Sequence, residues 1–341
     1  MPEIGCFCAL FYVNYIKMSA LLSFCHYSQR KPMKARYFVG TLRNSFFLFA
    51  LLGPLLVSGC GEHRVTGIEP VPPSIVQPQG EANRFELATW NIENFPQESS
   101  TVELVGKIIA ALDIDLYAIQ EISDTSAFRD LLDLLPDYDG FFSGDSYSWG
   151  YQKTGVIYKR SIVSVSQMRQ LFEDDWYAFT RPPLEAHMVA EKDGRRFDFV
   201  LIVMHLKAGS EEDDLNRRRQ AAQRLKNYLD AQVAANAEKD YLIAGDWNDE
   251  IDDPSYTNAF TVLIEDTLNY RFLTAPLAGQ SVAASFPRYG SLIDHILVSQ
   301  DVFAEYQGGL TKTLRLDDEL ANYLSEVSDH RPVMATFPVF E

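Results

Sequence analysis

Six polar residues that could do chemistry share one kind of position in this sequence. Each lies at or just beyond the end of a stretch that is otherwise apolar, as expected at the end of a buried strand. One such residue alone would be read as a solvated loop residue. Six at corresponding positions instead favour a shared active-site edge, because loops on a rigid sheet carry function. The six are Glu121, His205, Asp246, Asn248, Asp294 and His330.

The donor atoms of this set indicate the chemistry. Carboxylate and carbonyl oxygens bind hard dications such as Mg²⁺, and one or two acids are enough because the ion keeps several waters. Histidine can donate to a phosphoryl oxygen or relay a proton near neutral pH. A buried aspartate paired with histidine fixes its tautomer. These residue types therefore fit metal-assisted hydrolysis of a phosphoester.

Several other chemistries lack their motifs in this chain. The sequence has no G-x-S-x-G elbow of a serine hydrolase. It also has no P-loop, no G-x-G-x-x-G run and no H-E-x-x-H pair. No cysteine follows Cys60, so the remaining chain can form neither a disulfide nor a thiolate metal site. The chemistry must come from oxygen and nitrogen groups.

Charge bears on the substrate. The chain of 341 residues carries a formal net charge of −17, and beyond residue 60 it holds 24 basic and 46 acidic residues, a net of −22. Such a field repels polyanions at long range, which disfavours broad, charge-steered binding of nucleic acid. A local basic site stays compatible with this composition.

Residues 1–60 are typical of a targeting segment. Met33 is the better start: Lys34, Arg36 and Arg43 follow it, then an apolar run from Ser45 to Val57, then "LVSGC" ending at Cys60. "LVSGC" resembles the lipobox of bacterial lipoproteins, which implies lipid attachment at Cys60. An uncleaved transmembrane anchor or an ordinary signal peptide are the alternatives, although the apolar run is shorter than the ~20 residues of a span.

These features predict the location of the protein. We expect a lipoprotein of the cell envelope, in the outer membrane if the source is Gram-negative, or a secreted protein. Residues 61–83 are rich in Pro and Gln and are expected to form an extended tether, so the folded domain is assigned to 84–341.

The pattern beyond residue 84 alternates strands and helices, which predicts an α/β domain. Apolar or alternating stretches predict strands at 85–94, 114–122, 155–160, 162–167, 184–190, 197–206, 241–246, 291–299 and 331–340. Helical periodicity predicts helices at 102–112, 126–135 and 213–235.

Seven short motifs in this order resemble the endonuclease/exonuclease/phosphatase superfamily, also called DNase I-like. The resemblance spans about 84–340. It implies a four-layer α/β sandwich of two packed mixed β-sheets flanked by helices. It also implies a divalent-metal-dependent phosphoester hydrolase. We expect a monomer. The motifs are "TWNIENF", "IQEI", "GVIYKR", "MHLKAG", "AGDWND", "SLIDHILVS" and "SDHRPV".

The resemblance also implies roles for matching positions. Glu121 is expected to be the main metal ligand, helped by Asn91 and Asp329, with Mg²⁺ as the ion and Mn²⁺ or Ca²⁺ as alternatives. Asp246 and Asn248 resemble the pair that positions or deprotonates the attacking water and holds the phosphate.

Further roles follow from the same resemblance. His330 would contact the scissile phosphoryl oxygens, oriented by Asp294, and Arg181 would stabilise charge in the transition state. His205 matches a histidine of the DNase and sphingomyelinase branches. Pancreatic-type DNases orient that histidine with a glutamate, but this chain has Gln152 in that stretch, so we expect a different orientation here.

Three substrate classes remain open. A nuclease or other phosphodiesterase comes first, followed by a phospholipid or sphingomyelin phosphodiesterase and a sugar or inositol phosphatase. A non-catalytic surface binding module is the alternative from another class. The aromatic loops 143–152 and 172–180 are expected either to stack on a substrate ring or to anchor themselves. Glu93 and Asn94 are expected only to satisfy loop backbone groups.

Overall fold

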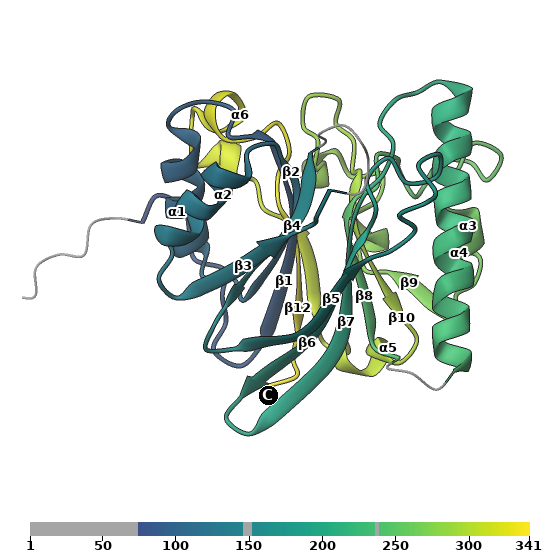
Figure 1. The fold of residues 1–341 in the computed structure, drawn as a ribbon, viewed down its shortest axis with the longest axis horizontal. Helices are drawn as coiled ribbons and strands as arrows, with labels where there is room; N and C mark the ends of the chain where they lie inside the picture. Colours follow the sequence, from purple (N-terminus) through teal and green to yellow (C-terminus); the bar gives the residue numbers. More distant parts are fainter. Residues whose placement is uncertain (1–73, 146–151, 236–238) are drawn as a thin grey trace, which may run out of the picture. The chain divides into compact units, whose positions relative to one another are not determined.

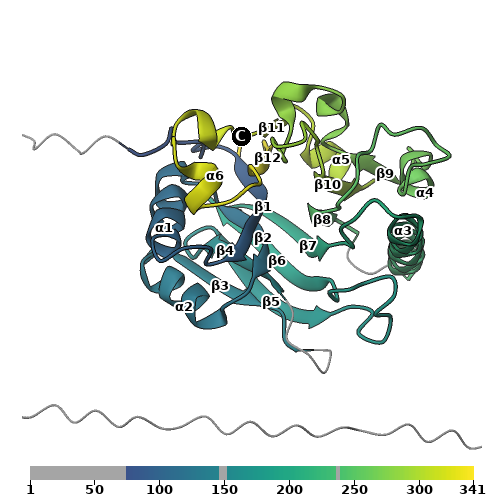
Figure 2. The ribbon, with the colours of Figure 1, turned by 90° about the horizontal axis from the view of Figure 1, so that it is seen from above.

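The computed structural model describes residues 74–145, 152–235 and 239–341, all within one compact unit, Glu69–Glu341. Two sheets pack face to face in the middle of this unit (Figure 1). Helices α1 (Thr101–Leu112) and α2 (Thr125–Asp133) cover the outer face of one sheet, and α3 (Glu212–Ala234) covers the other (Figure 2). The predicted four-layer α/β sandwich is confirmed.

Each sheet holds six of the described strands and mixes parallel with antiparallel pairs. The first sheet has the order β11 (Leu310–Thr313), β12 (Val333–Phe337), β1 (Phe85–Phe95), β2 (Leu116–Ile122), β4 (Lys153–Lys159) and β3 (Tyr138–Phe142). The second has the order β5 (Val163–Gln170), β6 (Leu184–Lys192), β7 (Arg195–His205), β8 (Tyr241–Asp246), β10 (Asp294–Ser299) and β9 (Tyr270–Phe272).

Short helices connect the remaining strands. They are α4 (Thr261–Ile264), α5 (Val302–Glu305) and α6 (Tyr323–Glu326), with 3-10 turns at η1 (Ala275–Leu277), η2 (Ser281–Ala283) and η3 (Leu316–Asp318). In the part of the chain that the structure describes, no helix has the length and apolar character needed to cross a bilayer. The predicted start at Met33, the targeting pattern and Cys60 lie outside the described residues.

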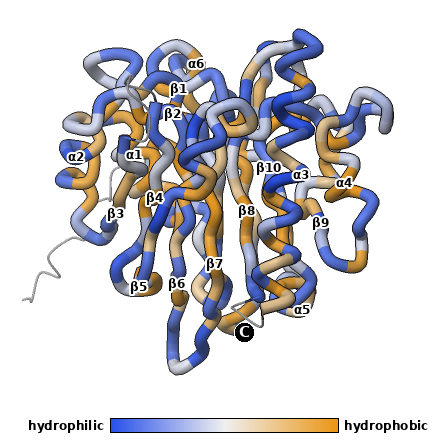
Figure 3. Tube along the Cα trace, turned by 45° about the vertical axis from the view of Figure 1, so that its right-hand side comes forward, coloured by the Kyte–Doolittle hydropathy of each residue, from blue (hydrophilic) through white to orange (hydrophobic). Residues whose placement is uncertain are grey.

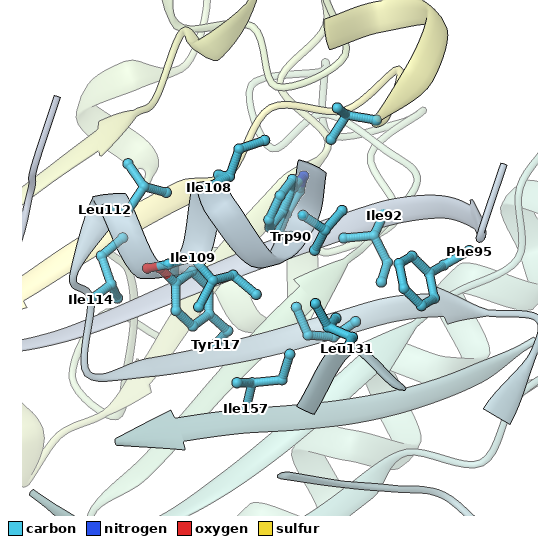
Figure 4. Packing of buried hydrophobic residues seen from close by; sticks show 14 of the residues in the cluster. Trp90, Ile92, Phe95, Ile108, Ile109, Leu112, Ile114, Tyr117, Leu131 and Ile157 are labelled. Carbon is cyan, nitrogen blue, oxygen red and sulfur yellow. The ribbon is translucent and has the colours of Figure 1, made fainter. Parts of the chain in front are cut away.

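The alternation of β1 explains why the sheet has two apolar faces. Phe85 and Leu87 point into the core between the sheets, whereas Trp90 and Ile92 pack under α1 and α2. Figure 4 shows this second cluster, with Trp90 and Ile92 among residues of α1, β2 and β4. In Figure 3 the middle of β7 and β8 is hydrophobic, as strands buried on both faces require.

Topology brings several strand ends to one edge. β1 runs parallel to β2, and β7 runs parallel to β8, so the carboxyl ends of these four strands lie at the same end of the sandwich. β12 and β10 are antiparallel to β1 and β8, so their first residues reach that same edge. This edge lies away from the C-terminus marked in Figure 1.

The end of the predicted tether differs from expectation. Within residues 74–83, Val76 is 1% exposed and belongs to the core beneath α1. The backbone N–H groups of Gln79 and Gly80 donate to Leu112 O at 2.8 and 3.0 Å. The core beneath α1 buries the apolar side chain of Val76, and the carbonyl at the end of α1 accepts hydrogen bonds from two backbone donors. These last residues therefore pack on the domain instead of extending away from it.

Candidate active site

A cleft of about 650 Å³ opens at the shared edge of the two sheets. A larger hollow of about 740 Å³ lies elsewhere, between Arg196 and Glu341, but no histidine lines it. The edge cleft instead collects both acids and histidines. Its lining comprises Glu93, Asn94, Glu121, Arg181, His205, Ala208, Gly209, Ser210, Asp246, Asn248, Phe286, Tyr289, Ile293, Asp329 and His330.

Two of these residues, His205 and Asp246, form one row across the second sheet together with the buried Asp294. Asp246 pairs in register with His205 of β7 on one side and with Asp294 of β10 on the other. Leu242 and Ala244, which precede Asp246 on the same face of β8, lie in the core between the sheets. The three side chains of the row therefore point to the same side of the sheet as the core residues, but they are polar and lie at the edge of the core.

Glu121 reaches the cleft through an irregular strand. The register of β2 shifts between Ile119 and Ile122, and Glu121 has φ +67°, a conformation that a non-glycine residue adopts only at a cost. Regular alternation would place Glu121 opposite to its buried neighbour Gln120. The bulge instead brings Glu121 Oε1 to 3.1 Å from Asn91 Nδ2 at the end of β1.

Asp294 and His330 form a buried pair. His330 Nδ1 lies 2.8 Å from Asp294 Oδ2, and Asp294 is fully buried. Burial would lower the pKa of His330, but the carboxylates of Asp294 and Asp246 outweigh it and raise that pKa to about 10. The imidazole is therefore cationic near neutral pH, and a cation next to the cleft attracts phosphate.

The backbone around His330 is fixed by neighbouring elements. Tyr323 of α6 donates its hydroxyl to His330 O at 2.5 Å and accepts from Trp90 Nε1 at 3.0 Å. Ser328 Oγ donates to Asn91 O at 2.7 Å and accepts from His330 N at 3.0 Å. These bonds tie the approach to β12 to β1, which sets where the imidazole lies.

Asp246 sits at the centre of the site. Its Oδ2 accepts from Asn91 Nδ2 at 3.0 Å and lies 3.6 and 3.9 Å from the Nε2 atoms of His205 and His330. Its Oδ1 accepts from the backbone N–H of Asn248 at 2.9 Å. Burial and the Asp294 carboxylate raise the pKa of Asp246 to about 7. A carboxylate of this strength suits proton transfer near neutral pH.

His205 is a neutral imidazole in this arrangement. It is 2% exposed, and its Nδ1 makes no hydrogen bond within the described residues. Burial and the positive charges of Arg181 and His330 lower the pKa of His205 well below its usual range. Its Nε2 lies 3.6 Å from Asp246 Oδ2 and 3.8 Å from Glu121 Oε1.

The sequence predicts that Gln152 does not replace the glutamate that orients this histidine in pancreatic-type DNases, and in the structure Gln152 makes its hydrogen bonds elsewhere. It bridges two other site residues, donating Nε2 to Glu121 Oε2 at 2.9 Å and accepting from Arg181 Nη2 at 2.5 Å on Oε1. A neutral amide thus separates the guanidinium from the carboxylate. Arg181 lines the cleft, and its buried Nε has no hydrogen-bond partner in the described part of the chain. It offers N–H groups to an anion in the cleft.

The donor set fits a hard dication. Glu121, Glu93 and Asp329 all line the cleft, and burial raises the pKa of both Glu93 and Asp329. Crowded carboxylate oxygens with unbalanced charge are the ligands that Mg²⁺ or Ca²⁺ prefers. Asn91, predicted to help, here turns its amide N–H atoms to Glu121 and Asp246, while its oxygen accepts from Glu93 N at 3.0 Å.

A second group has metal-binding geometry. Asp246, Asp294 and His330 have ligand atoms within 4.8 Å of one another. However, His330 Nδ1 and Asp294 Oδ2 are already hydrogen-bonded to each other. The cleft offers two donor groups that fit a dication, the carboxylates around Glu121 and this buried cluster.

The structure brings every site residue predicted for the folded domain to this edge. Seven of them line the cleft. Asn91 lies behind Glu121 and Asp246, to which it donates, and Asp294 lies behind His330.

The sequence predicts for Glu93 and Asn94 only the role of satisfying loop backbone groups. Glu93 Oε2 does accept from Asp329 N at 2.9 Å, but Glu93 and Asn94 also line the cleft. The sequence predicts no place in the site for Gln152, Phe286 or Tyr289. The only available signals were the position of Glu93 in "TWNIENF" and of the aromatic pair just before "SLIDH".

The aromatic side of the cleft comes from Phe286 and Tyr289, whereas the loop 172–180 follows the anchoring alternative. Phe286 stacks on His330 with ring centroids 4.8 Å apart, and Tyr289 lies 5.3 Å from Phe286. Trp176 and Tyr177, from the loop 172–180, pack against each other and Arg217 and are not part of the cleft lining. Trp149 and Tyr151 lie outside the described residues.

Solved structures share this fold at low sequence identity. A D. rerio TDP2 complexed with a single-strand DNA product has a TM-score of 0.54 and 13% identity, covering 74% of this chain and 98% of that one. An endonuclease/exonuclease/phosphatase from Bacteroides vulgatus has a TM-score of 0.53 and 20% identity over 74% and 98% of the two chains. A mannosyl-6-phosphatase of Bacteroides thetaiotaomicron has a TM-score of 0.51 and 17% identity over 74% and 98%.

Sequence comparison agrees with the fold. No curated protein sequence matches the chain at a significant level. The profile of the family described as "Endonuclease/Exonuclease/phosphatase family" matches residues 88–330, which include every site residue placed above. The chain belongs to the endonuclease/exonuclease/phosphatase family.

Proposed function

We propose that this protein is a divalent-metal-dependent phosphodiesterase. Membership in a family of phosphoester hydrolases supports hydrolysis of a phosphoester in general. The observation that carries the proposal is the position of Asp246. Its Oδ2 lies within 3.6 and 3.9 Å of the Nε2 atoms of His205 and His330, so a base and two hydrogen-bond partners surround one small space.

The residues divide the chemistry among them. Asp246 accepts a proton from the attacking water while the oxygen of that water forms a bond to phosphorus. Cationic His330, held by Asp294, donates to a phosphoryl oxygen and stabilises the charge that grows there. Arg181 offers further N–H groups to the same charge. The leaving oxygen takes its proton from solvent, because the cleft is open.

Glu121, Glu93 and Asp329 would hold the ion, by their shared place in the cleft. A bound dication supplies Lewis-acid polarisation of the phosphoryl oxygens. Gln152 and Asn94 keep Glu121 in place, with Asn94 N donating to Glu121 Oε2 at 2.8 Å and Gln152 Nε2 donating to Asn94 Oδ1 at 2.6 Å. The carboxylate that would bind the ion is therefore fixed in advance.

The aromatic wall favours a diester with a ring-bearing group. Phe286 and Tyr289 extend from His330 toward solvent, where Tyr289 is 70% exposed. A flat ring attached to the phosphate would stack there, whereas a sugar phosphate would call for polar groups. One structural neighbour holds single-strand DNA. Because the net charge of −17 repels long polyanions, we expect the cleft to bind only a short nucleic-acid segment or a small diester.

We also propose that the protein acts outside the cytoplasm through a lipid on Cys60. The support is the pattern of "LVSGC" after an apolar run. Cell fractionation of the full chain and its Cys60→Ser variant tests this. We expect the parent in the membrane fraction and the variant released or retained as precursor; equal distribution of the two would contradict lipid anchoring.

The catalytic proposal is tested with the full chain, assayed with Mg²⁺ or with EDTA. The substrates are bis-p-nitrophenyl phosphate, p-nitrophenyl phosphate, plasmid DNA, RNA and sphingomyelin, and His330→Ala serves as the control for contaminating enzymes. We expect EDTA-sensitive hydrolysis of the small diester that the variant lacks. Cleavage of the monoester alone would make the protein a phosphatase, and inactivity on every substrate would support a binding module.

A further inference from the structure

We infer that Arg218 of α3 is a positioning residue that holds two cleft loops together. The inference rests on the proposed hydrolysis of a phosphodiester. Arg218 is 4% exposed, although it belongs to a helix that faces solvent over much of its surface. It lies one turn before Ala221 and Ala222 on the buried stripe of α3, where an apolar residue would be expected.

A buried guanidinium is costly unless its N–H groups find partners. Arg218 Nη1 donates to Lys207 O and to Gly209 O, both at 2.8 Å, and its Nε donates to Asp249 Oδ2 at 3.0 Å. The first two acceptors belong to the loop after β7, and the third belongs to the loop after β8. One side chain therefore joins two loops that come from different strands.

Both loops form part of the cleft. Ala208, Gly209 and Ser210 line it on one side, and Asn248 lines it next to Asp249. Asn248 also donates Nδ2 to Leu206 O at 3.2 Å, so the two loops touch directly as well. The position of Asn248 thus depends on the same contact that Arg218 secures from behind.

The loop after β8 contains a strained residue, Asn248, and the loop after β7 contains a position that only glycine fits. Asn248 has φ +55° and Gly209 has φ +118°, and a Cβ at Gly209 would come within 2.1 Å of Asp214 Oδ2. Strained backbone persists only where its surroundings determine it. A second hydrogen bond fixes the loop after β8, because His295 Nε2 lies 3.1 Å from Asp249 O. Arg218 does not line the cleft, so it acts through Asn248 and the loop after β7.

Three variants separate positioning from stability. Arg218→Met leaves the Asp249 carboxylate half-buried without its partner, and we expect it to lose both stability and activity. The double variant Arg218→Met with Asp249→Asn removes that unpaired charge and should regain most of the melting temperature. Arg218→Lys keeps the charge but cannot reach both loops from one nitrogen. Arg224→Ala is the matched control, since Arg224 of the same helix pairs with Asp175 at 3.3 Å but is exposed.

The readouts are kcat and KM for bis-p-nitrophenyl phosphate, the melting temperature, and amide hydrogen exchange. We expect the double variant and Arg218→Lys to lose kcat by about tenfold to a hundredfold, because misplacement of a positioning group by about 1 Å has effects of that size. KM should change less, and exchange should accelerate in residues 206–210 and 247–250. Arg224→Ala should match the parent.

Wild-type kcat in the double variant, or faster exchange confined to α3, would overturn the inference. Hydrogen exchange makes the result independent of the catalytic proposal. If the parent protein hydrolyses no diester yet exchange accelerates in both loops of the variants, the proposed function fails and the positioning role stands.

Discussion

His330 Nδ1 and Asp294 Oδ2 lie 2.8 Å apart, although Asp294 belongs to one sheet and His330 lies just before a strand of the other. Asp294 begins β10 of the second sheet, and His330 precedes β12 of the first. The pair forms only because the sheets pack with the amino ends of these two strands at one edge. The central charge of the proposed site is thus a product of tertiary packing, set by the core between the sheets.

The pair predicts the effect of Asp294→Asn. An amide of the same shape cannot stabilise the imidazolium, so we expect kcat for a diester to fall about a hundredfold or more, by analogy with other Asp–His pairs. The melting temperature near neutral pH should fall as well, because the buried His330 imidazolium loses the carboxylate that raises its pKa. Steady-state kinetics and a thermal melt check this, and kcat within threefold of the parent would remove Asp294 from the mechanism.

A second buried acid, far from the cleft, predicts how stability depends on pH. Glu86 is 1% exposed, its Oε1 accepts from Glu81 N at 2.8 Å, and its Oε2 has no partner among the described residues. Burial and the neighbouring Asp115 raise the pKa of Glu86 from its ordinary 4.5 to about 9. Between these values the folded chain keeps a proton that the unfolded chain has lost, so the free energy of unfolding falls as pH rises.

Glu86→Gln should remove this pH dependence. We expect the difference in unfolding free energy between the variant and the parent to grow in favour of the variant by at least about 1 kcal/mol from about pH 6 to pH 9. Urea unfolding at several pH values measures it, with Glu81→Gln as an exposed control on the same surface. Parallel pH profiles for the variant and the parent would show that Glu86 keeps its ordinary pKa.

Sequence reasoning found the strands that are strongly apolar and missed those that are not. β1, β2 and β8 were predicted because buried strands leave long apolar or alternating runs. β11, "LTKT", is polar and half-exposed, and β9 has three residues. β3, "YDGFF", contains Gly140, which reads as a turn; here the glycine is required because a Cβ would come within 2.6 Å of Val156 O.

The same physics limits prediction of the site. Asp246, Asp294 and His205 could be found because strand ends share an edge whatever the details of the loops. Glu93 could not, since its place depends on a left-handed backbone with φ +35°. The role of Arg218 depends on acceptors in two loops that are distant along the chain, which no local pattern encodes.

Glu121→Gln tests where the metal binds. The amide keeps the shape but loses the charge, so we expect the Mg²⁺ concentration for half-maximal activity to rise at least about tenfold. Calorimetric titration of Mg²⁺ into the protein gives the same comparison without turnover. Glu103→Gln, at an exposed pair with Lys107 on α1, is the control. An unchanged Mg²⁺ requirement would move the ion to another group of acids.

Tyr323→Phe tests the brace behind His330. Loss of the hydroxyl leaves the buried Trp90 N–H and the His330 carbonyl without a partner. We expect the free energy of unfolding to fall by about 2 kcal/mol, the usual cost of buried groups left unsatisfied. Denaturant unfolding measures this, with the exposed Tyr256→Phe as the control. No difference between the two variants would show that the hydroxyl is dispensable.

Tyr289→Ala tests whether the aromatic wall selects ring-bearing diesters. Stacking of a base on an aromatic side chain contributes about 1–3 kcal/mol, which corresponds to a rise in KM of about fivefold to a hundredfold. We expect that rise for thymidine 5′-p-nitrophenyl phosphate and a much smaller one for methyl p-nitrophenyl phosphate, which lacks the base. Trp176→Ala is the matched control, because Trp176 is 59% exposed but does not line the cleft. Equal changes on both substrates would mean that Tyr289 contacts the leaving group or none of the substrate, and the preference for a ring-bearing diester would fall.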